Sequence, residues 1–368
     1  MKIKKKDILK YLIITVIFSV SFCFIVKYLG IKKIIPWNIG YSDLGPWSNK
    51  AFEKGFPYAD KFVEYPVIIG ITMHLASRLG GNFYLYFHYI IFLACAIIST
   101  IYLYKLSEIM GTNKKYLFIF WALAPSLLWF SFYNWDIIAV MFSILAVYYY
   151  KERKDILAAI FLSLGFSTKM YPVLFLFPVL LHRRFKDWIR IGMAFLGTFL
   201  AVNAYFMINN FTMWYGIYGF HSQRMPNPDS IWWIIMQFIP SLNVETVNTL
   251  TLIIFASGYL IVNFKFRKKG FIFASFMSVF LFLLVNKVFS PQYLLWLLPF
   301  FALFGLNMIA FYLMEFLNLA VLFSTLIHIF SFQEFTTALV YSSVFVVLRH
   351  IVLAYAFVKK IIPARGAS

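Results

Sequence analysis

The chain has 368 residues, of which 62% are hydrophobic, 21% aromatic and only 13% charged. Soluble domains carry roughly 25% charged residues, so this composition excludes a soluble enzyme and predicts a polytopic membrane protein. The formal net charge of +19 comes from basic clusters between apolar runs, the distribution expected for a membrane protein, which argues against nucleic-acid binding. Cys23 and Cys95 lie inside apolar runs and provide neither a disulfide framework nor zinc-ligand spacing.

Ten apolar runs follow one another along the chain, and a membrane-spanning helix needs about 20 apolar residues. The runs cover residues 9–29, 83–104, 116–133, 137–150, 191–209, 246–264, 271–288, 293–306, 308–330 and 337–357. They predict an all-α polytopic membrane protein with about ten transmembrane helices, organised as a single integral-membrane domain over residues 1–368.

The Lys and Arg residues gather at alternate ends of these runs. Clusters occur at the N-terminus and near residues 105–115, 151–154, 183–190, 265–269 and 359–365. Cytoplasmic loops are rich in Lys and Arg, so we expect these loops and both chain termini to be cytoplasmic. The basic start MKIKKKDILK, followed by an apolar run, is typical of a retained signal anchor. Most acidic residues fall on the opposite, extracytoplasmic side.

Two apolar segments do not fit simple spans. Ile156–Leu181 lies between two cytoplasmic basic clusters, so it must enter and leave the membrane on the same side. Pro172 lacks an N–H and disfavours helix just before it, which predicts a re-entrant helical hairpin with its turn near Lys169. Val67–Leu79 is too short to span, and we expect it to lie in or dip through the interface.

The longest polar interruption of the N-terminal third is Tyr41–Pro66, within a first extracytoplasmic loop predicted at residues 30–82. Pro46–Gly55 reads as a short amphipathic helix lying in the interface plane. It would hold the preceding Asp43 just above the outer leaflet. From spacing alone, Asp43 is equally well interpreted as a catalytic carboxylate or as an anion stabilising the start of that helix.

Two other acidic residues of the outer loops have patterns that favour a structural role. Glu64 precedes Pro66, which can begin a helix, so Glu64 lies beside the positive end of that helix. Asp136 follows Asn134 and Trp135 in a tight connection between two spans, where an Asp usually caps a helix.

Lys169 lies at the tip of the predicted hairpin, deep in the membrane. A charged residue there is costly unless it is paired, so it is a functional candidate by default. The alternative is snorkelling along its own aliphatic stem. A lipid phosphate would be an adequate partner for its ammonium group.

Further cations and polar groups occur in the later outer loops. The second large extracytoplasmic loop, predicted at residues 210–245, contains His221 and Arg224 three residues apart. Arg matches phosphate bidentately and His can hold or transfer a proton. Lys287 and Gln292 lie in another polar turn, NKVFSPQY.

Six motifs in register resemble glycosyltransferase family 87. They are YSDLGPW, FEKGFPYADKFVEYP, NWD, STKMYP, HSQRMPNPDSIWW and FSPQYLLWLLP, and they run from about residue 38 to residue 300. The family consists of integral-membrane mannosyltransferases of the GT-C type. The resemblance implies a GT-C fold, a polyprenyl-phosphate sugar donor, usually mannose, and activity on the outer face. It also implies that the catalytic base, an Asp in the first outer loop of the family, corresponds to Asp43.

The chemistry of such a transfer agrees with these residues. A base must take the proton of the acceptor hydroxyl, and cations must stabilise the leaving phosphate. We assign the base to Asp43, donor-phosphate binding to a set of polar groups, and supporting roles to neighbours in the same motifs. The phosphate set is Lys169, His221, Arg224, Lys287 and Gln292, and the supporting set is Glu64, Tyr65, Asp136 and Tyr171.

No cluster of carboxylates has the spacing of magnesium or manganese ligands, so a metal-independent inverting transfer without a further cofactor is the simplest scheme. The expected partners are the lipid-linked sugar donor, a glycolipid or glycan acceptor and membrane lipids. A multi-pass transporter or lipid flippase remains an alternative, although such proteins often show internal symmetry and midplane ionisable residues. A membrane scaffold would explain the helices but not Lys169 or the His221/Arg224 pair.

Overall fold

The computed structural model describes residues 5–48, 55–330 and 335–361. Within these ranges the regular secondary structure is helical, and one isolated bridge pairs Pro57 with Lys61. The prediction of an all-α protein is therefore confirmed for the described residues. The chain forms two compact units, residues 1–221 with 298–304 and residues 222–297 with 305–368. A single functional domain over the whole chain stays a prediction.

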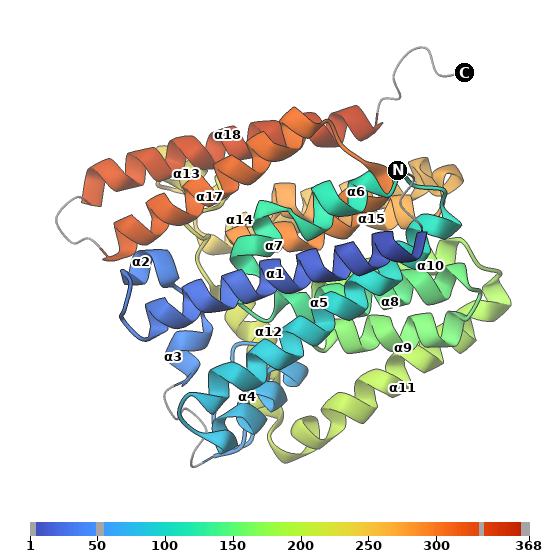
Figure 1. Cartoon of the computed structure of the whole chain (residues 1–368), viewed down its shortest axis with the longest axis horizontal. Helices are drawn as coiled ribbons and strands as arrows, with labels where there is room; N and C mark the ends of the chain where they lie inside the picture. Colours follow the sequence, from blue (N-terminus) through green and yellow to red (C-terminus); the bar gives the residue numbers. More distant parts are fainter. Residues whose placement is uncertain (1–4, 49–54, 331–334, 362–368) are drawn as a thin grey trace. The chain divides into compact units, whose positions relative to one another are not determined.

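The helices of the first unit are α1 Lys5–Ile31, α2 Trp37–Gly40, α3 Leu44–Ser48, α4 Val67–Leu79, α5 Phe83–Ile109, α6 Lys115–Leu117, the π-helical turn η1 Phe118–Ala122, α7 Pro125–Phe130, α8 Asp136–Lys151, α9 Asp155–Phe166, the 3₁₀ turn η2 Tyr171–Phe175, α10 Leu176–Leu181, α11 Phe185–Asn209, most of α12 Phe211–Gln223, and α16 Leu298–Phe304. Here α1 packs on α5, α5 on α8, and α8 on α9, which also contacts α11 (Figure 1).

The helices of the second unit are α13 Ile231–Phe238, α14 Val244–Lys265, η3 Arg267–Lys269, α15 Phe271–Val285, η4 Pro291–Trp296, α17 Met308–Phe330 and α18 Phe335–Ile361. In this unit α17 packs on α18, and α15 contacts both α14 and α18. Arg349 is wholly buried, donates to Asn318 Oδ1 at 2.8 Å, and stacks on the ring of Phe289 at 3.9 Å. Asn318 in turn donates to the Pro291 carbonyl at 2.8 Å. This chain of contacts fixes the loop before η4 onto α17 and α18.

Six helices of the described residues are long and apolar enough to cross a membrane: Asp7–Ile31, Phe83–Ile109, Phe185–Asn209, Val244–Lys265, Met308–Ile327 and Ser342–Lys360. Only 17% of the most apolar part of α11 is buried inside the protein, compared with 50% for α5. An apolar helix that exposes most of its surface suits hydrocarbon rather than water. The helices therefore indicate a multi-pass membrane protein.

The other four predicted spans form helices that are interrupted or are shorter than the roughly 20 residues needed to cross a membrane. Residues 116–133 form α6, η1 and α7, and the break falls just before Pro125, which cannot donate a helical hydrogen bond. Residues 293–306 form η4 and α16, while α8 and α15 have only 16 and 15 residues. The number of ten spans therefore stays a prediction.

The first loop turns back sharply after α1. A Cβ atom added at Gly30 would collide with the backbone of Gly40, so α1 and α2 cross at a distance that only glycine permits. This crossing directs the following residues toward the site described below. Helix α3 begins at Leu44, two residues before the predicted start, and the rest of the predicted helix at 49–54 lies outside the described residues. Helix α4 coincides with the predicted segment Val67–Leu79.

The segment between the basic clusters at 151–154 and 183–190 folds as a helical hairpin. Its arms are α9 on one side and η2 with α10 on the other, and Lys169 lies in the connecting turn. Arg183, just after the second arm, donates through Nε and Nη2 to both oxygens of Asp155, which begins the first arm, at 2.7 Å each. The bidentate pair holds the two open ends together. Entry of this hairpin into the membrane from one side stays a prediction.

Cysteine labelling tests that topology. In a variant without the buried Cys23 and Cys95, we expect an impermeant maleimide to modify Asn82→Cys in intact cells but neither Lys151→Cys nor Lys186→Cys. All three positions are exposed. After the membrane is permeabilised, all three should react. Labelling of only one of positions 151 and 186 from outside would show that the hairpin crosses the membrane.

Candidate functional site

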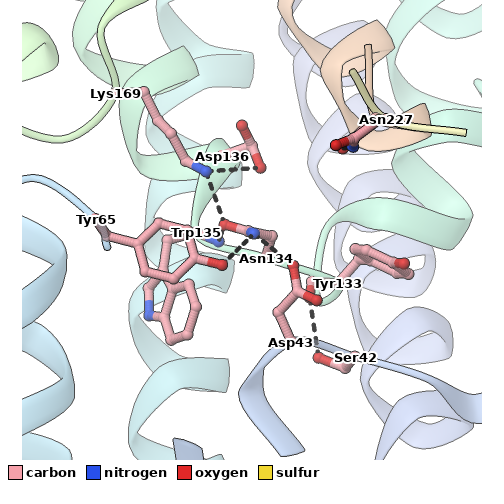
Figure 2. A network of polar contacts seen from close by, with 10 residues as sticks. Ser42, Asp43, Tyr65, Tyr133, Asn134, Trp135, Asp136, Lys169 and Asn227 are labelled. Carbon is pink, nitrogen blue, oxygen red and sulfur yellow. Dashed lines mark hydrogen bonds and ion pairs between the residues drawn. The ribbon is translucent and has the colours of Figure 1, made fainter. Parts of the chain in front are cut away.

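The residues around Asp43 are fastened to the turn between α7 and α8. The Asp43 N–H donates to the Tyr133 carbonyl at 2.9 Å. The Ser42 hydroxyl donates to the carbonyls of Phe132 at 2.9 Å and Tyr133 at 3.1 Å. It also accepts the Leu44 N–H at 3.3 Å. Ser42 therefore provides the side-chain contact at the start of α3, and the Asp43 side chain is available for other partners (Figure 2).

The Asp43 carboxylate is partly buried and receives one hydrogen bond on each oxygen. The Tyr41 hydroxyl donates to Oδ1 at 2.8 Å, and the Asn134 amide donates to Oδ2 at 2.6 Å. Each carboxylate oxygen has two lone pairs, so both oxygens can still accept another hydrogen bond. The contacts fix the orientation of the carboxylate and leave it able to take a proton.

The Asn134 side chain joins Asp43 to Lys169. Its Oδ1 accepts from Lys169 Nζ at 3.0 Å and from the Trp135 N–H at 2.6 Å, while its amide nitrogen also lies 3.3 Å from the Tyr65 hydroxyl. An ammonium group can only donate and an ionised carboxylate can only accept. These two neighbours therefore fix which end of the amide faces Asp43 (Figure 2).

Lys169 has a second, charged partner. Its Nζ lies 3.6 Å from Oδ2 of Asp136, which is wholly buried in the first turn of α8. It also lies 4.9 Å from the centre of the Tyr65 ring. Lys169 is only 8% exposed, so it is paired inside the protein and does not snorkel to the surface. Asp136 is buried as the counter-ion of Lys169, and Asp43 is the more accessible of the two carboxylates.

The electrostatics of the loop favour Asp43 as a group that can exchange a proton. Burial raises the pKa of Asp43, and the charge of Glu64 adds to this rise. Hydrogen bonds from Tyr41 and Asn134 and the charge of Lys169 oppose it. Burial also raises the pKa of Tyr41, as does the neighbouring Asp43, so Tyr41 stays a protonated donor. A carboxylate with a raised pKa is a stronger base than an ordinary one.

The predicted site residues fall into two groups, one in each unit. In the first unit Asp43, Tyr65, Asp136 and Lys169 lie together. Tyr171, two residues after Lys169, is buried, and its hydroxyl accepts a hydrogen bond from the Ser143 hydroxyl at 2.9 Å. Glu64 is partly buried just before α4, and His221 lies in the last turn of α12.

In the second unit Lys287 donates to the Ser222 carbonyl at 3.0 Å and to the Arg224 carbonyl at 2.8 Å. Burial and the charge of Arg224 both lower the pKa of Lys287. Gln292 is 5% exposed, and its Oε1 accepts no hydrogen bond from the described residues. The two hydrogen bonds of Lys287 thus fix the backbone on both sides of residue 223, at Ser222 and at Arg224.

Sequence reasoning did not assign roles to Tyr41 and Asn134, the two side chains that hold Asp43. Tyr41 stands in the motif YSD, two positions before Asp43, and this spacing is the local signal for its contact. Asn134 stands in the motif NWD but contacts Asp43, which is 91 residues away, so its own motif gives no signal. Within the described ranges no three His, Cys, Asp or Glu side chains come together as a metal site. The absence of a metal requirement stays a proposal.

Comparison with known families gives one match. The model of glycosyltransferase family 87 matches residues 64–286, which is more than half of the chain. The matched range contains Asn134, Asp136 and Lys169, and it begins after Asp43. No curated protein matches the chain.

The buried ion pair gives a testable expectation for stability. Lys169→Met leaves Asp136 buried without its cation, which should lower the free energy of unfolding by about 3–5 kcal/mol. The double variant Lys169→Met/Asp136→Asn should recover part of that loss, because the uncompensated charge is gone. Both are measured by denaturant unfolding in detergent.

The matched control is Arg183→Met in the same hairpin. Its partner Asp155 has a 23% exposed side chain, so water can solvate the remaining charge and the loss should be smaller. Equal destabilisation by the Lys169 single and double variants would mean that Asp136 does not depend on Lys169.

Proposed function

Because the chain belongs to glycosyltransferase family 87, we propose that it transfers a hexose, with mannose as the first candidate, from a polyprenyl-phosphate donor. The acceptor is a lipid or glycan hydroxyl on the extracytoplasmic face of the cell membrane. The donor is a co-substrate, and no metal or further cofactor takes part. The observation that carries the proposal is the partly buried Asp43 carboxylate, which Tyr41 and Asn134 hold by one hydrogen bond on each oxygen, so that each oxygen can accept another.

The proposed reaction is a single displacement. The acceptor hydroxyl donates a hydrogen bond to Asp43 and passes its proton to the carboxylate as its oxygen bonds to the anomeric carbon. The bond between that carbon and the phosphate oxygen breaks, and the polyprenyl phosphate leaves with the electron pair. Attack opposite the leaving group inverts the anomeric configuration, so a β-linked donor gives an α-linked product.

Positive groups stabilise the charge that develops on the leaving phosphate. We assign this role to Lys169, His221 and Arg224, with Lys287 and Gln292 as further donor-phosphate contacts. Lys169 has three N–H donors, and its contacts with Asn134 and Asp136 leave one of them for a substrate oxygen. Lys287 donates a hydrogen bond to the backbone carbonyl of Arg224 and so helps to position that residue.

The first test removes the base and keeps its shape. Asp43→Asn can still accept from Asn134 and contact Tyr41, so the variant should fold and bind donor. It should transfer about 10²–10⁴-fold more slowly, because an amide cannot take the acceptor's proton. The assay is transfer from a labelled polyprenyl-phosphate mannose to a lipid extract of the host, together with thermal unfolding.

Two acidic neighbours of the same loop serve as controls. Asp60 accepts a hydrogen bond from the Phe56 N–H, so Asp60→Asn should leave turnover near normal. Glu64→Gln should also retain activity. If Asp43→Asn loses only about 1 kcal/mol of stability, as for a helix cap, and keeps its turnover, Asp43 is structural. An inactive Glu64→Gln beside an active Asp43→Asn would assign the base to Glu64.

The second test concerns the phosphate. Arg224→Ala removes a charge-assisted contact worth about 1.5–3 kcal/mol, so the KM for donor should rise about ten- to a hundredfold. Arg224→Lys should restore only part of the affinity, since lysine lacks the bidentate fork. Arg78→Ala, at the exposed end of α4, is the matched control. An unchanged donor KM in Arg224→Ala and His221→Ala would remove both residues from the phosphate site.

A further inference from the structure

Lys27 is a wholly buried lysine inside the apolar helix α1. Among the described residues, no carboxylate lies within ion-pair distance of its ammonium group. A charged side chain within a membrane span is costly when it is unpaired, so such a residue needs an explanation other than packing.

The ammonium group of Lys27 is surrounded by aromatic rings. It lies 4.5 Å from the centre of the Trp129 ring and 5.4 Å from that of Tyr133. Its nearest acceptor is the Ile39 carbonyl at 3.4 Å, a long hydrogen bond. Cation–π contacts recover only part of the cost of burying an ammonium group, and a neutral side chain of similar shape would fill the space at lower cost.

Two of these contacts involve the segments that fasten Asp43. Ile39 belongs to α2, which leads into Tyr41 and Asp43. Tyr133 receives the Asp43 N–H on its carbonyl, and its ring lies 5.4 Å from the Tyr41 ring. Lys27 therefore contacts the Ile39 carbonyl and the Tyr133 ring, which belong to the two segments that fix the carboxylate, and its charge interacts electrostatically with Cys23 and Asp43.

We propose that Lys27 is a positioning residue for Asp43: its positive charge, held against the two segments that fasten the carboxylate, favours the ionised form of Asp43. Because Lys27 is wholly buried, it acts through Asp43 and does not touch substrate. The inference rests on the proposed role of Asp43 as the general base.

The expected effect has a definite sign. Asp43 acts as a base only when it is ionised, so activity falls as the pH drops through its pKa. Removing the Lys27 charge disfavours ionisation and moves this fall to higher pH. The other titratable groups around Asp43 are unchanged in such a variant: Tyr41, Glu64, Tyr65, Tyr133 and Lys169.

The experiment compares pH–rate profiles of the full-length protein in lipid nanodiscs. Lys27→Met should lose on the order of tenfold in rate on the acid side of the profile, and stay within about twofold at the alkaline plateau. Its thermal stability should be equal to or above that of the wild type, because an unpaired buried charge has been removed. Lys27→Arg keeps the charge and should restore the acid side.

The matched control is Lys114→Met, because Lys114 also lies over an aromatic ring, that of Tyr104 at 4.5 Å, and contacts a backbone carbonyl. It should not move the profile. If Lys27→Met does not fold, Lys27→Gln provides the neutral variant. A profile that does not move in the neutral variant, with lowered thermal stability, would overturn the proposal and make Lys27 a packing residue.

A second measurement separates this inference from the proposed function. The Asp43 carboxyl is followed by carbon-13 resonance in aspartate-labelled protein and identified by its absence in Asp43→Asn. We expect it to titrate at higher pH in Lys27→Met than in the wild type, whatever the enzyme transfers. An unchanged titration would overturn the role of Lys27 alone, whereas full activity of Asp43→Asn would overturn the base assignment.

Discussion

The amide of Asn134 is the contact on which the arrangement of the candidate site depends. It donates to Asp43 and accepts from Lys169, so one side chain ties the first loop to the hairpin turn. The Trp135 N–H adds a third bond that fixes the amide plane. Because each partner can only donate or only accept, the amide has a single satisfactory orientation.

An amide between a carboxylate and an ammonium group has a chemical advantage over direct contact. A lysine bonded directly to Asp43 would strongly favour the ionised carboxylate and weaken it as a base. In this chain the direct partner of Lys169 is Asp136, and the hydrogen bonds that the described residues donate to Asp43 come from neutral groups. The two carboxyl groups thus have different environments, one wholly buried beside a cation and one partly buried and left basic, which is a general way to separate structural and reactive acids.

The sequence predicted the helical membrane class and the helical hairpin, and it indicated Asp43 and Lys169 as candidates, because apolar length, proline and isolated charge are local signals. It did not predict that Asn134 holds Asp43, since a hydrogen bond across 91 residues leaves no local pattern. The Tyr41 contact is local, two residues away, but the side-chain orientation that makes it is not encoded in the spacing. Nor did the sequence distinguish the roles of Asp43 and Asp136. Both precede or begin a helix, and only burial and the position of Lys169 separate them. Apolar length does not reveal how much of a helix is covered by protein, so the sequence does not decide whether the 16-residue α8 spans a membrane.

The separation of Asp136 and Lys169 along the chain has a consequence for biosynthesis. Helix α8 precedes the hairpin turn that carries Lys169 in the chain, so during synthesis Asp136 is made before its counter-ion. The carboxyl group gains this partner only when the hairpin folds back and the Asp155–Arg183 pair closes its open end. Folding of α8 onto its final contacts is therefore coupled to completion of the hairpin.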